Sequence, residues 1–151
     1  MKTLKCAVVL ASVVCMSSVY AQATKKVDDK KDIVKATKTI TAKLMSFEVG
    51  DYVHAILKDA KGKEHSMWID GEGVDYFLAI HAKKMLTIKY QTVSTYIPEA
   101  GGRETIDRII SAKFGKLDSA TWWKAERKKS SVEALTKKYD PLMQKLSANG
   151  G

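Results

Sequence analysis

The sequence predicts a mainly β protein with added α-helices, in which three strands, a short helix and two further strands are followed by C-terminal helices. Two observations indicate this order. Strand-like alternation and β-branched side chains dominate residues 37–93, with one interruption at helical spacing. After residue 114 apolar side chains recur at helical spacing, and residues typical of helix caps precede them.

The first three strands are expected at residues 37–47, 52–58 and 63–70. The first is rich in β-branched residues and alternates loosely between apolar and polar. The second and third flank a short segment of turn-forming residues, which predicts a hairpin. In that turn, Gly62 suits the left-handed position of a three-residue loop with a bulge.

A helix is expected at residues 74–82, because apolar side chains occur there at spacings of three, four and seven. Residues 85–93 return to alternation and predict a fourth strand. Residues 97–102 contain a proline and a glycine pair and predict a loop. Residues 104–114 predict the fifth strand, although their isoleucines would fit a helix almost as well.

The C-terminal region is expected to be helical. Asp118 can cap a segment that contains both C-terminal tryptophans, and Ser130 with Glu133 matches a capping box. Asp140 followed by Pro141 predicts the start of another helix, because proline is favoured at the first helical position. One apolar stripe runs through these segments and should dock on the strands: Val132, Leu135, Tyr139, Leu142, Met143 and Leu146.

The first residues have the pattern of a secretory signal peptide. Lys2 and Lys5 form a basic start, residues 6–16 form an apolar run, and small residues allow cleavage after Ala21 or Ala23. The apolar run is too short to cross a bilayer, which needs about 20 residues. We expect an exported protein, periplasmic or extracellular, that is soluble after cleavage and keeps no transmembrane segment.

Both cysteines, Cys6 and Cys15, lie within this leader. The mature chain would therefore contain no disulfide, thiol nucleophile or cysteine metal ligand. Lipidation of Cys15 is the alternative to a soluble product, but Val14 stands where a lipoprotein signal needs a small residue.

The order of three strands, a helix and two strands resembles that of the OB-fold, a five-stranded Greek-key barrel. By this resemblance the chain is similar to small exported OB-fold domains with C-terminal helices added. The expected organisation is a signal peptide at 1–23, a flexible basic lead-in at 24–36, an OB-like barrel at 37–114, a helical extension at 115–147 and a disordered tail at 148–151.

The excess of positive charge lies in the two flanks. The segment 24–38 has six lysines and three aspartates, whereas 39–112 has nine basic and ten acidic residues. From residue 113 to the end there are nine basic and four acidic residues. One hypothesis is therefore a structural or interaction protein whose flanks contact an anionic envelope surface. The plainer interpretation is a solvated, soluble surface.

The predicted turn also sets the register of the hairpin. If Asp59 and Lys63 flank a three-residue loop, side chains pair outward from that turn, and one face of the hairpin is mostly apolar. This face should belong to the core; it pairs Val53 with Ile69, Ala55 with Met67 and Leu57 with His65.

The opposite face of the hairpin carries Tyr, His, Ile and Trp side chains, and so large an apolar patch is unusual on a surface turned to solvent. In OB-folds the ligand-binding face includes strands 2 and 3, which this hairpin would supply. We therefore take this face as the candidate binding site: Tyr52, His54, Ile56, Ser66, Trp68 and Asp70.

Two alternatives to this site remain open at this stage. Trp68 and Tyr52 could lie beneath the C-terminal helices, whose apolar stripe needs a surface to cover. A four-residue turn would also shift the register and mix the two faces of the hairpin.

The chain contains no catalytic signature. Its three histidines are not spaced as a metal pair, so no metal or other cofactor is expected. The favoured function is a non-enzymatic binding module for a small ligand, peptide or envelope component. Single-stranded nucleic acid is an alternative through Trp68, Tyr52 and Tyr90, but the neutral barrel segment and the export signal disfavour it. A hydrolase with an unrecognised site is the remaining hypothesis.

Overall fold

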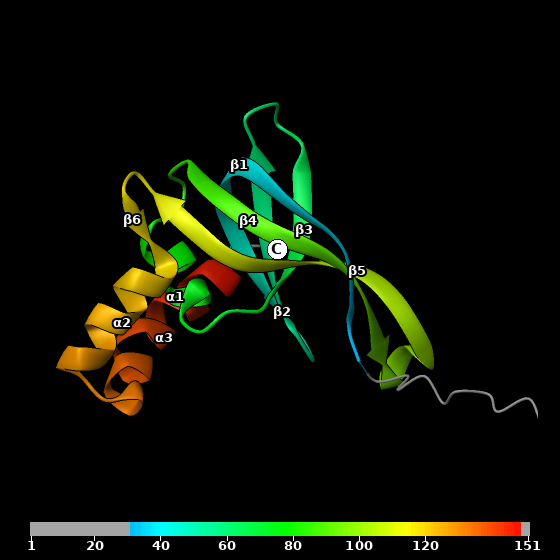
Figure 1. Cartoon of the computed structure of the whole chain (residues 1–151). Coiled ribbons are helices and arrows are strands. Elements are labelled where there is room, and N and C mark those ends of the chain that lie inside the picture. The colour runs from blue at the N-terminus through cyan, green and yellow to red at the C-terminus, as the bar shows by residue number, and fades with distance from the viewer. Residues whose placement is uncertain (1–30, 149–151) are drawn as a thin grey trace, which may run out of the picture.

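The structure is a computed structural model that describes residues 31–148 (Figure 1). Three strands, a helix, further strands and the C-terminal helices follow in the predicted order, and a short 3₁₀ turn separates β4 from β5. The elements are β1 (Ile33–Val49), β2 (Val53–Asp59), β3 (Glu64–Ile69), α1 (Val74–Ile80), β4 (Leu86–Ile97), η1 (Pro98–Ala100), β5 (Gly102–Phe114), β6 (Leu117–Asp118), α2 (Ser119–Lys129) and α3 (Val132–Ala148).

The strands form one sheet in the order β3-β2-β1-β4-β5-β6, and neighbours in this order are antiparallel. A parallel pairing of β3 with β5 closes the sheet in a ring, with Trp68 opposite Arg108 and Ile69 opposite Ile109. The Asp70 N–H donates to the Ile109 carbonyl oxygen at 2.9 Å and extends this contact. The closure brings together two segments about 40 residues apart in the chain.

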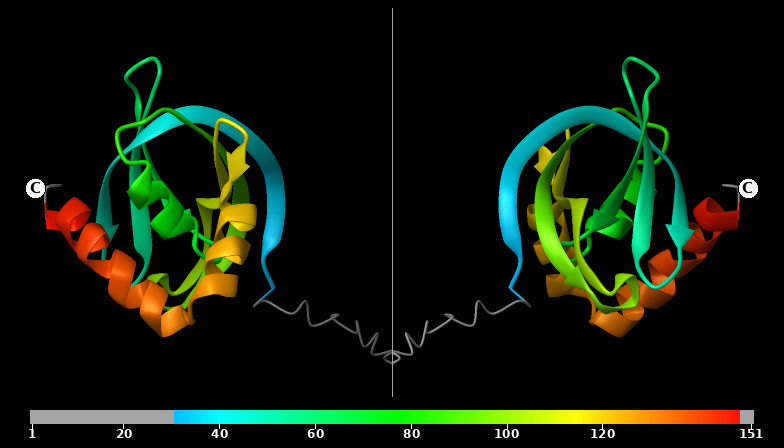
Figure 2. Two further views of the ribbon diagram at one scale, coloured as in Figure 1. Left: turned by 90° about the vertical axis from the view of Figure 1, so that its left-hand side faces the viewer. Right: turned by 90° about the vertical axis from the view of Figure 1, so that its right-hand side faces the viewer.

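β1 is long because it pairs with two other strands, β2 and β4. Its first half pairs with β4 and its second half with β2, and Ala42 belongs to both ladders. Irregularities between Val34 and Ala36, and between Leu44 and Ser46, interrupt the two ladders. Since bulges bend a strand and increase its twist, they help β1 to curve around the ring (Figure 2).

The main core fills the inside of the ring. Ala55, Leu57 and Met67 of the hairpin are buried there, as are Phe77 and Leu78 of α1. Figure 2 shows α1 within the outline of the curved sheet. The 3.6-residue period of α1 and the two-residue period of the strands therefore direct their apolar side chains to one common centre.

A second, smaller cluster joins α2 and α3 to the outer side of α1. Trp123, Leu135 and Tyr139 are buried in it, with Tyr76 and Trp122 partly buried beside them. The ring centroids of Tyr76 lie 5.7 Å from Trp123 and 5.5 Å from Tyr139. The C-terminal helices are thus held partly by aromatic packing on α1, and Leu146 of α3 is also buried in the main core.

The predicted mainly β organisation with one helix between the third and fourth strands is confirmed, and residues 104–114 are a strand. The expectation of five strands was incomplete, because the two residues of β6 pair with the end of β5. β1 begins at Ile33, so residues 33–36 of the predicted lead-in belong to a strand. Residues 1–23, both cysteines and residues 149–151 lie outside the described part, whereas residue 148 ends α3.

The caps of the C-terminal helices differ in part from expectation. Asp118 caps α2 as predicted, accepting from the Thr121 N–H at 2.9 Å. Ser131, and not Ser130, caps α3, since its hydroxyl accepts from the Ala134 N–H at 3.2 Å. The second helix expected at Asp140 does not form separately, because α3 continues through Pro141. None of the helices within 31–148 has the length and apolarity to cross a membrane.

Candidate functional site: the outer face of the β2–β3 hairpin

The hairpin turn has the predicted geometry. The Asp59 N–H donates to the Lys63 carbonyl oxygen at 2.9 Å, and Gly62 has a φ of +83°. The Asp59 carboxylate accepts from the backbone N–H groups of Lys61 and Lys63 at 2.8 and 2.9 Å and contacts His65 Nε2 at 3.1 Å. The hydrogen bond with His65, followed by those from the backbone, lowers the pKa of Asp59. The local sequence therefore defines the turn without help from the rest of the fold.

The register that follows from this turn is confirmed for the pairs between residues 54–58 and 64–68. Ala55 and Met67, opposite each other, are buried, as is Leu57. On the other face, Tyr52, Ser66 and Asp70 are exposed, while His54, Ile56 and Trp68 are half-buried. The two faces are therefore separated as predicted, and the alternative of a four-residue turn is excluded.

Two aromatic rings of the candidate site form a stack. The ring centroids of Tyr52 and Trp68 lie 3.9 Å apart at an interplanar angle of 16°. Trp68 covers one face of the Tyr52 ring, but Tyr52 remains 38 % exposed. His54 approaches Trp68 edge-on, with centroids 5.6 Å apart. The hairpin thus presents an aromatic platform at the point where β2 begins.

A polar contact borders this platform. His54 Nδ1 lies 3.2 Å from Ser66 Oγ, so a hydroxyl and an imidazole share a hydrogen bond on the exposed face. Nucleophilic catalysis by such a pair also needs a group that orients the imidazole. Among residues 31–148 no carboxylate forms a hydrogen bond with His54. The pair is suited to binding a polar group, and the hydrolase stays a hypothesis.

The closure of the ring adds two charged residues that the sequence did not indicate. Arg108 lies beside Trp68 across the β3–β5 contact. Its Nη1 lies 2.6 Å from Asp32 and 3.1 Å from Asp70, and the Asp32 carboxylate also accepts from Thr95 at 2.5 Å. The Thr95 hydroxyl and Arg108 lower the pKa of Asp32. Asp32 is therefore docked on the sheet, in contrast to the flexible lead-in predicted for residues 24–36.

The C-terminal helices do not bury the aromatic platform. The ring contacts of Trp68 within the described residues are with Tyr52 and His54. The helices pack mainly against α1, β1 and β5. Val132, expected in their docking stripe, is 46 % exposed, whereas Leu135 and Leu146 are buried. Trp68 is also absent from both core clusters, so the occlusion considered from the sequence does not occur.

A hollow adjoins the platform between Tyr52 and the start of α3. Its lining includes Asp51, Tyr52 and Val132, and also Asp75 at the beginning of α1. Burial raises the pKa of Asp75. Hydrogen bonds from backbone N–H groups lower this pKa in part, and the nearby Asp140 carboxylate raises it further. The hollow therefore contains a carboxyl group whose charge the native state disfavours.

Asp75→Asn is expected to raise the free energy of unfolding at pH 7. The substitution removes a partly buried charge, while the amide oxygen can still accept from the Tyr76 N–H, which lies 2.8 Å from the Asp75 carboxylate. Because the native-state pKa of Asp75 is raised, the wild type gains stability as the pH falls through that pKa, and the advantage of the variant should shrink. Urea unfolding over a pH series measures this.

The exposed Asp51 lines the same hollow and gives a matched control. Asp51→Asn should change stability by less than about 0.5 kcal/mol at each pH. An advantage of Asp75→Asn that stays constant over the whole acid range would contradict the assignment of the effect to the carboxylate charge.

His54 and His65 lie on opposite faces of the hairpin as predicted, and His81 Nδ1 contacts the Phe77 carbonyl oxygen at 2.9 Å. Within 31–148 no three His, Cys, Asp or Glu side chains gather as a metal site. Tyr90, considered as a third stacking ring for nucleic acid, is buried in the core.

Comparison with known protein families, with curated proteins and with solved structures gives no match for this chain.

Proposed function

We propose that this protein is an exported, non-enzymatic binding module built on an OB-like barrel, and that its ligand contacts the outer face of the β2–β3 hairpin. The element order, the pairing of β1 with both β2 and β4, and the parallel contact of β3 with β5 support the barrel. The leader pattern of residues 1–23, which lie outside the described residues, supports export.

The observation that carries the proposal is the stack of Tyr52 on Trp68. Tyr52 stands in the loop between β1 and β2, and Trp68 is on β3, so the platform joins the two regions by which OB-folds bind ligands. Aromatic rings on a protein surface bind flat, weakly polar groups. The polar pair of His54 and Ser66 beside the platform can orient such a group by hydrogen bonds.

The charges around the platform favour an uncharged ligand over a polyanion. Asp32 and Asp70 both pair with Arg108, Arg103 also acts on Asp32, and Glu48 stands opposite His54 on β1. A nucleic acid would meet these carboxylates instead of the basic groove that single strands require. The ring of a neutral sugar has the required flat face and hydroxyl groups. We therefore propose an envelope glycan as the ligand class.

Titration with chitotetraose, a neutral oligosaccharide, tests the proposal by NMR of the three tryptophan indole N–H groups. The Trp68 signal should shift, and Tyr52→Ala should weaken binding about tenfold by removing the outer ring of the stack. Phe114→Ala is the matched control, because Phe114 is an aromatic residue of similar exposure at the far end of β5.

A shift of Trp68 with a ten-residue thymidine oligonucleotide, and none with the glycan, would support the nucleic-acid alternative instead. No response to the glycan, or a response that Tyr52→Ala leaves unchanged, would overturn the assignment of this face.

The alternative of a basic interaction protein has weaker support from the charges of the helices. Glu126 forms ion pairs with Lys129 at 3.6 Å and Lys138 at 3.1 Å, and Arg127 pairs with Glu72 at 2.5 Å. Part of the positive charge expected to contact an anionic surface is therefore compensated within the protein. Surface ion pairs of this kind add little stability but reduce the local field.

A further inference from the structure

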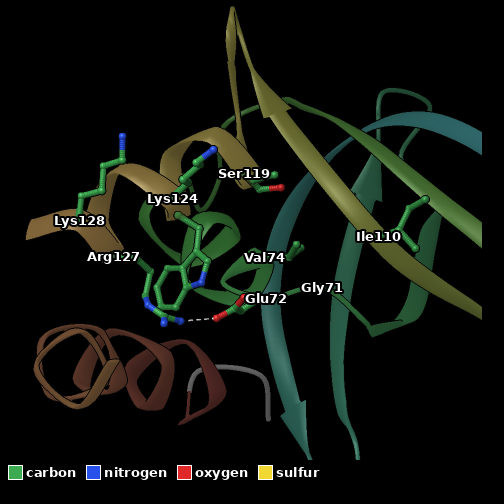
Figure 3. A pocket seen from close by; sticks show the side chains of 10 residues that line it. Gly71, Glu72, Val74, Ile110, Ser119, Lys124, Arg127 and Lys128 are labelled. Atoms are coloured by element: carbon green, nitrogen blue, oxygen red, sulfur yellow. Dashed lines mark hydrogen bonds and ion pairs between the residues drawn. The ribbon is translucent and has the colours of Figure 1, made fainter. Parts of the chain in front are cut away.

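A cavity of about 550 Å³ lies between the Gly71–Gly73 loop, β5 and α2 (Figure 3). Its volume is in the range of sites that bind small molecules. β5 and α2 are close to each other in the sequence, whereas the Gly71–Gly73 loop lies much earlier in the chain. The ring closure and the packing of α2 are therefore both needed to form the cavity. The lining residues are Gly71, Glu72, Val74, Ile110, Ser119, Ala120, Trp123, Lys124, Arg127 and Lys128.

The inner part of the cavity is apolar and firmly held. Val74 and Trp123 are almost fully buried, and Ile110 contributes from β5. Trp123 lies close to the backbone of Gly73 and has ring neighbours on two helices, with Tyr76 at 5.7 Å and Trp122 at 6.0 Å. A wall fixed from several sides is preorganised for an apolar group, which reduces the entropic cost of binding.

The rim of the cavity is cationic. Lys124, Arg127 and Lys128 are spaced by three and four residues on α2 and therefore share one face of the helix. Arg127 is paired with Glu72 at 2.5 Å, and Glu72 is the one acidic side chain among the lining residues. Lys124 and Lys128 have no ion pair within the described residues and project from α2 in the same direction (Figure 3). Their two charges are therefore available to an anion.

Hydrogen-bond donors in the wall also lack acceptors. Trp123 is 6 % exposed, and its Nε1–H is buried with no acceptor in the described part of the chain. The buried Ser119 hydroxyl accepts from the Ala112 N–H at 3.2 Å, which leaves its own proton to donate. A buried N–H without a partner costs free energy, and the π face of an aromatic ring in the ligand body can supply a weak acceptor for it.

We infer that this cavity binds a small amphipathic carboxylate, with its apolar body against Val74, Ile110 and Trp123 and its carboxylate at Lys124 and Lys128. The apolar interior of the cavity favours a ligand with an apolar body, and the two lysines without ion pairs favour a ligand with a negatively charged end. The neighbouring hollow, lined by Asp51 and Asp75, has the opposite charge and would repel the same ligand. The cavity shares Gly71, Glu72 and Trp123 with that hollow, but none of its lining residues belongs to the glycan face proposed above.

4-Phenylbutyrate is a suitable probe of this site. Two compounds serve for comparison: 4-phenylbutan-1-ol has the same apolar body without the charge, and butyrate has the charge with a smaller apolar body. In NMR titrations of the full chain, 4-phenylbutyrate should shift the indole N–H signal of Trp123 and leave that of Trp68 in place. Both comparison compounds should bind about fivefold more weakly or worse. Added salt should weaken the binding of the acid and not of the alcohol.

The double variant Lys124→Gln/Lys128→Gln should weaken the binding of 4-phenylbutyrate about fivefold or more. The control is Lys89→Gln/Lys137→Gln, which changes the net charge by the same amount at exposed sites elsewhere and should not weaken binding. All four lysines are exposed, so the variants should fold. Equal affinity for the alcohol, equal loss in both double variants, or a shift of Trp68 in place of Trp123 would overturn the inference. Because the two sites have different tryptophan reporters, failure here is distinguishable from failure of the glycan proposal.

Discussion

Gly73→Ala is expected to lower the free energy of unfolding by about 2–5 kcal/mol. Gly73 has a φ of +72°, a conformation that costs an L-residue about 1–2 kcal/mol. A Cβ at this position would also lie 2.6 Å from Cε3 and 2.7 Å from Cγ of Trp123. Forcing extra volume against a packed side chain costs about 1–3 kcal/mol. Because Trp123 anchors α2 on α1, the substitution should loosen the C-terminal helices as well.

Gly101→Ala separates the two contributions. Gly101 has the same φ of +72°, but no atom of residues 31–148 lies within 4 Å of the position that its Cβ would take. This control should cost about 1–2 kcal/mol, from the backbone conformation alone. Urea unfolding followed by circular dichroism measures both variants. Equal losses would show that Trp123 moves away freely, and the rigid wall inferred for the cavity would then be wrong.

The hairpin could be predicted from the sequence because its determinants are local. Asp59 accepts hydrogen bonds from the backbone two and four residues later, and Gly62 supplies the positive φ that the loop needs. Once the turn is defined, the two-residue period of a strand assigns every side chain to a face. The pairing of His54 with Trp68 follows from this rule alone, and the rest of the fold is not needed to predict it.

The charged border of the same site could not be predicted, because it depends on the closure of the ring. Arg108 reaches Trp68 only through the parallel contact of β3 with β5. Asp32 precedes the predicted first strand in a lysine-rich segment, which resembled a solvated lead-in. The spacing of residues in a sequence does not reveal contacts that arise only from the order of strands in the sheet, such as that of Arg108 with Trp68. The OB-like order suggested a ring but not which residues would stand beside the platform.

The C-terminal region shows how packing can override a local signal. Asp140 followed by Pro141 is typical of a helix start, yet α3 continues through both residues. The Asp140 carboxylate accepts from the Tyr76 hydroxyl at 3.0 Å and so serves a contact with α1 instead of a cap. Tyr139 and Leu146, on either side of the proline, are both buried. One continuous helix buries both, and this tertiary gain offsets the backbone hydrogen bond that proline cannot form.

Met67→Ala and Trp68→Ala should differ strongly in their effect on stability, although the residues are adjacent. Met67 is 1 % exposed inside the ring, so truncation to alanine should leave a cavity and cost about 2–5 kcal/mol. Trp68 is half-buried on the outer face, and its loss removes mainly the stack with Tyr52, worth about 1 kcal/mol. Urea unfolding followed by circular dichroism avoids dependence on the tryptophan that is removed.

The same pair of variants should differ in the opposite sense in binding. At a temperature where both are folded, Met67→Ala should keep the affinity for chitotetraose, while Trp68→Ala should abolish it, since no ring remains to support Tyr52. If Trp68→Ala destabilises the protein as much as Met67→Ala, Trp68 acts as a core residue, and the platform exists to close the ring rather than to bind. A destabilised Trp68→Ala variant that retains binding would assign the site elsewhere.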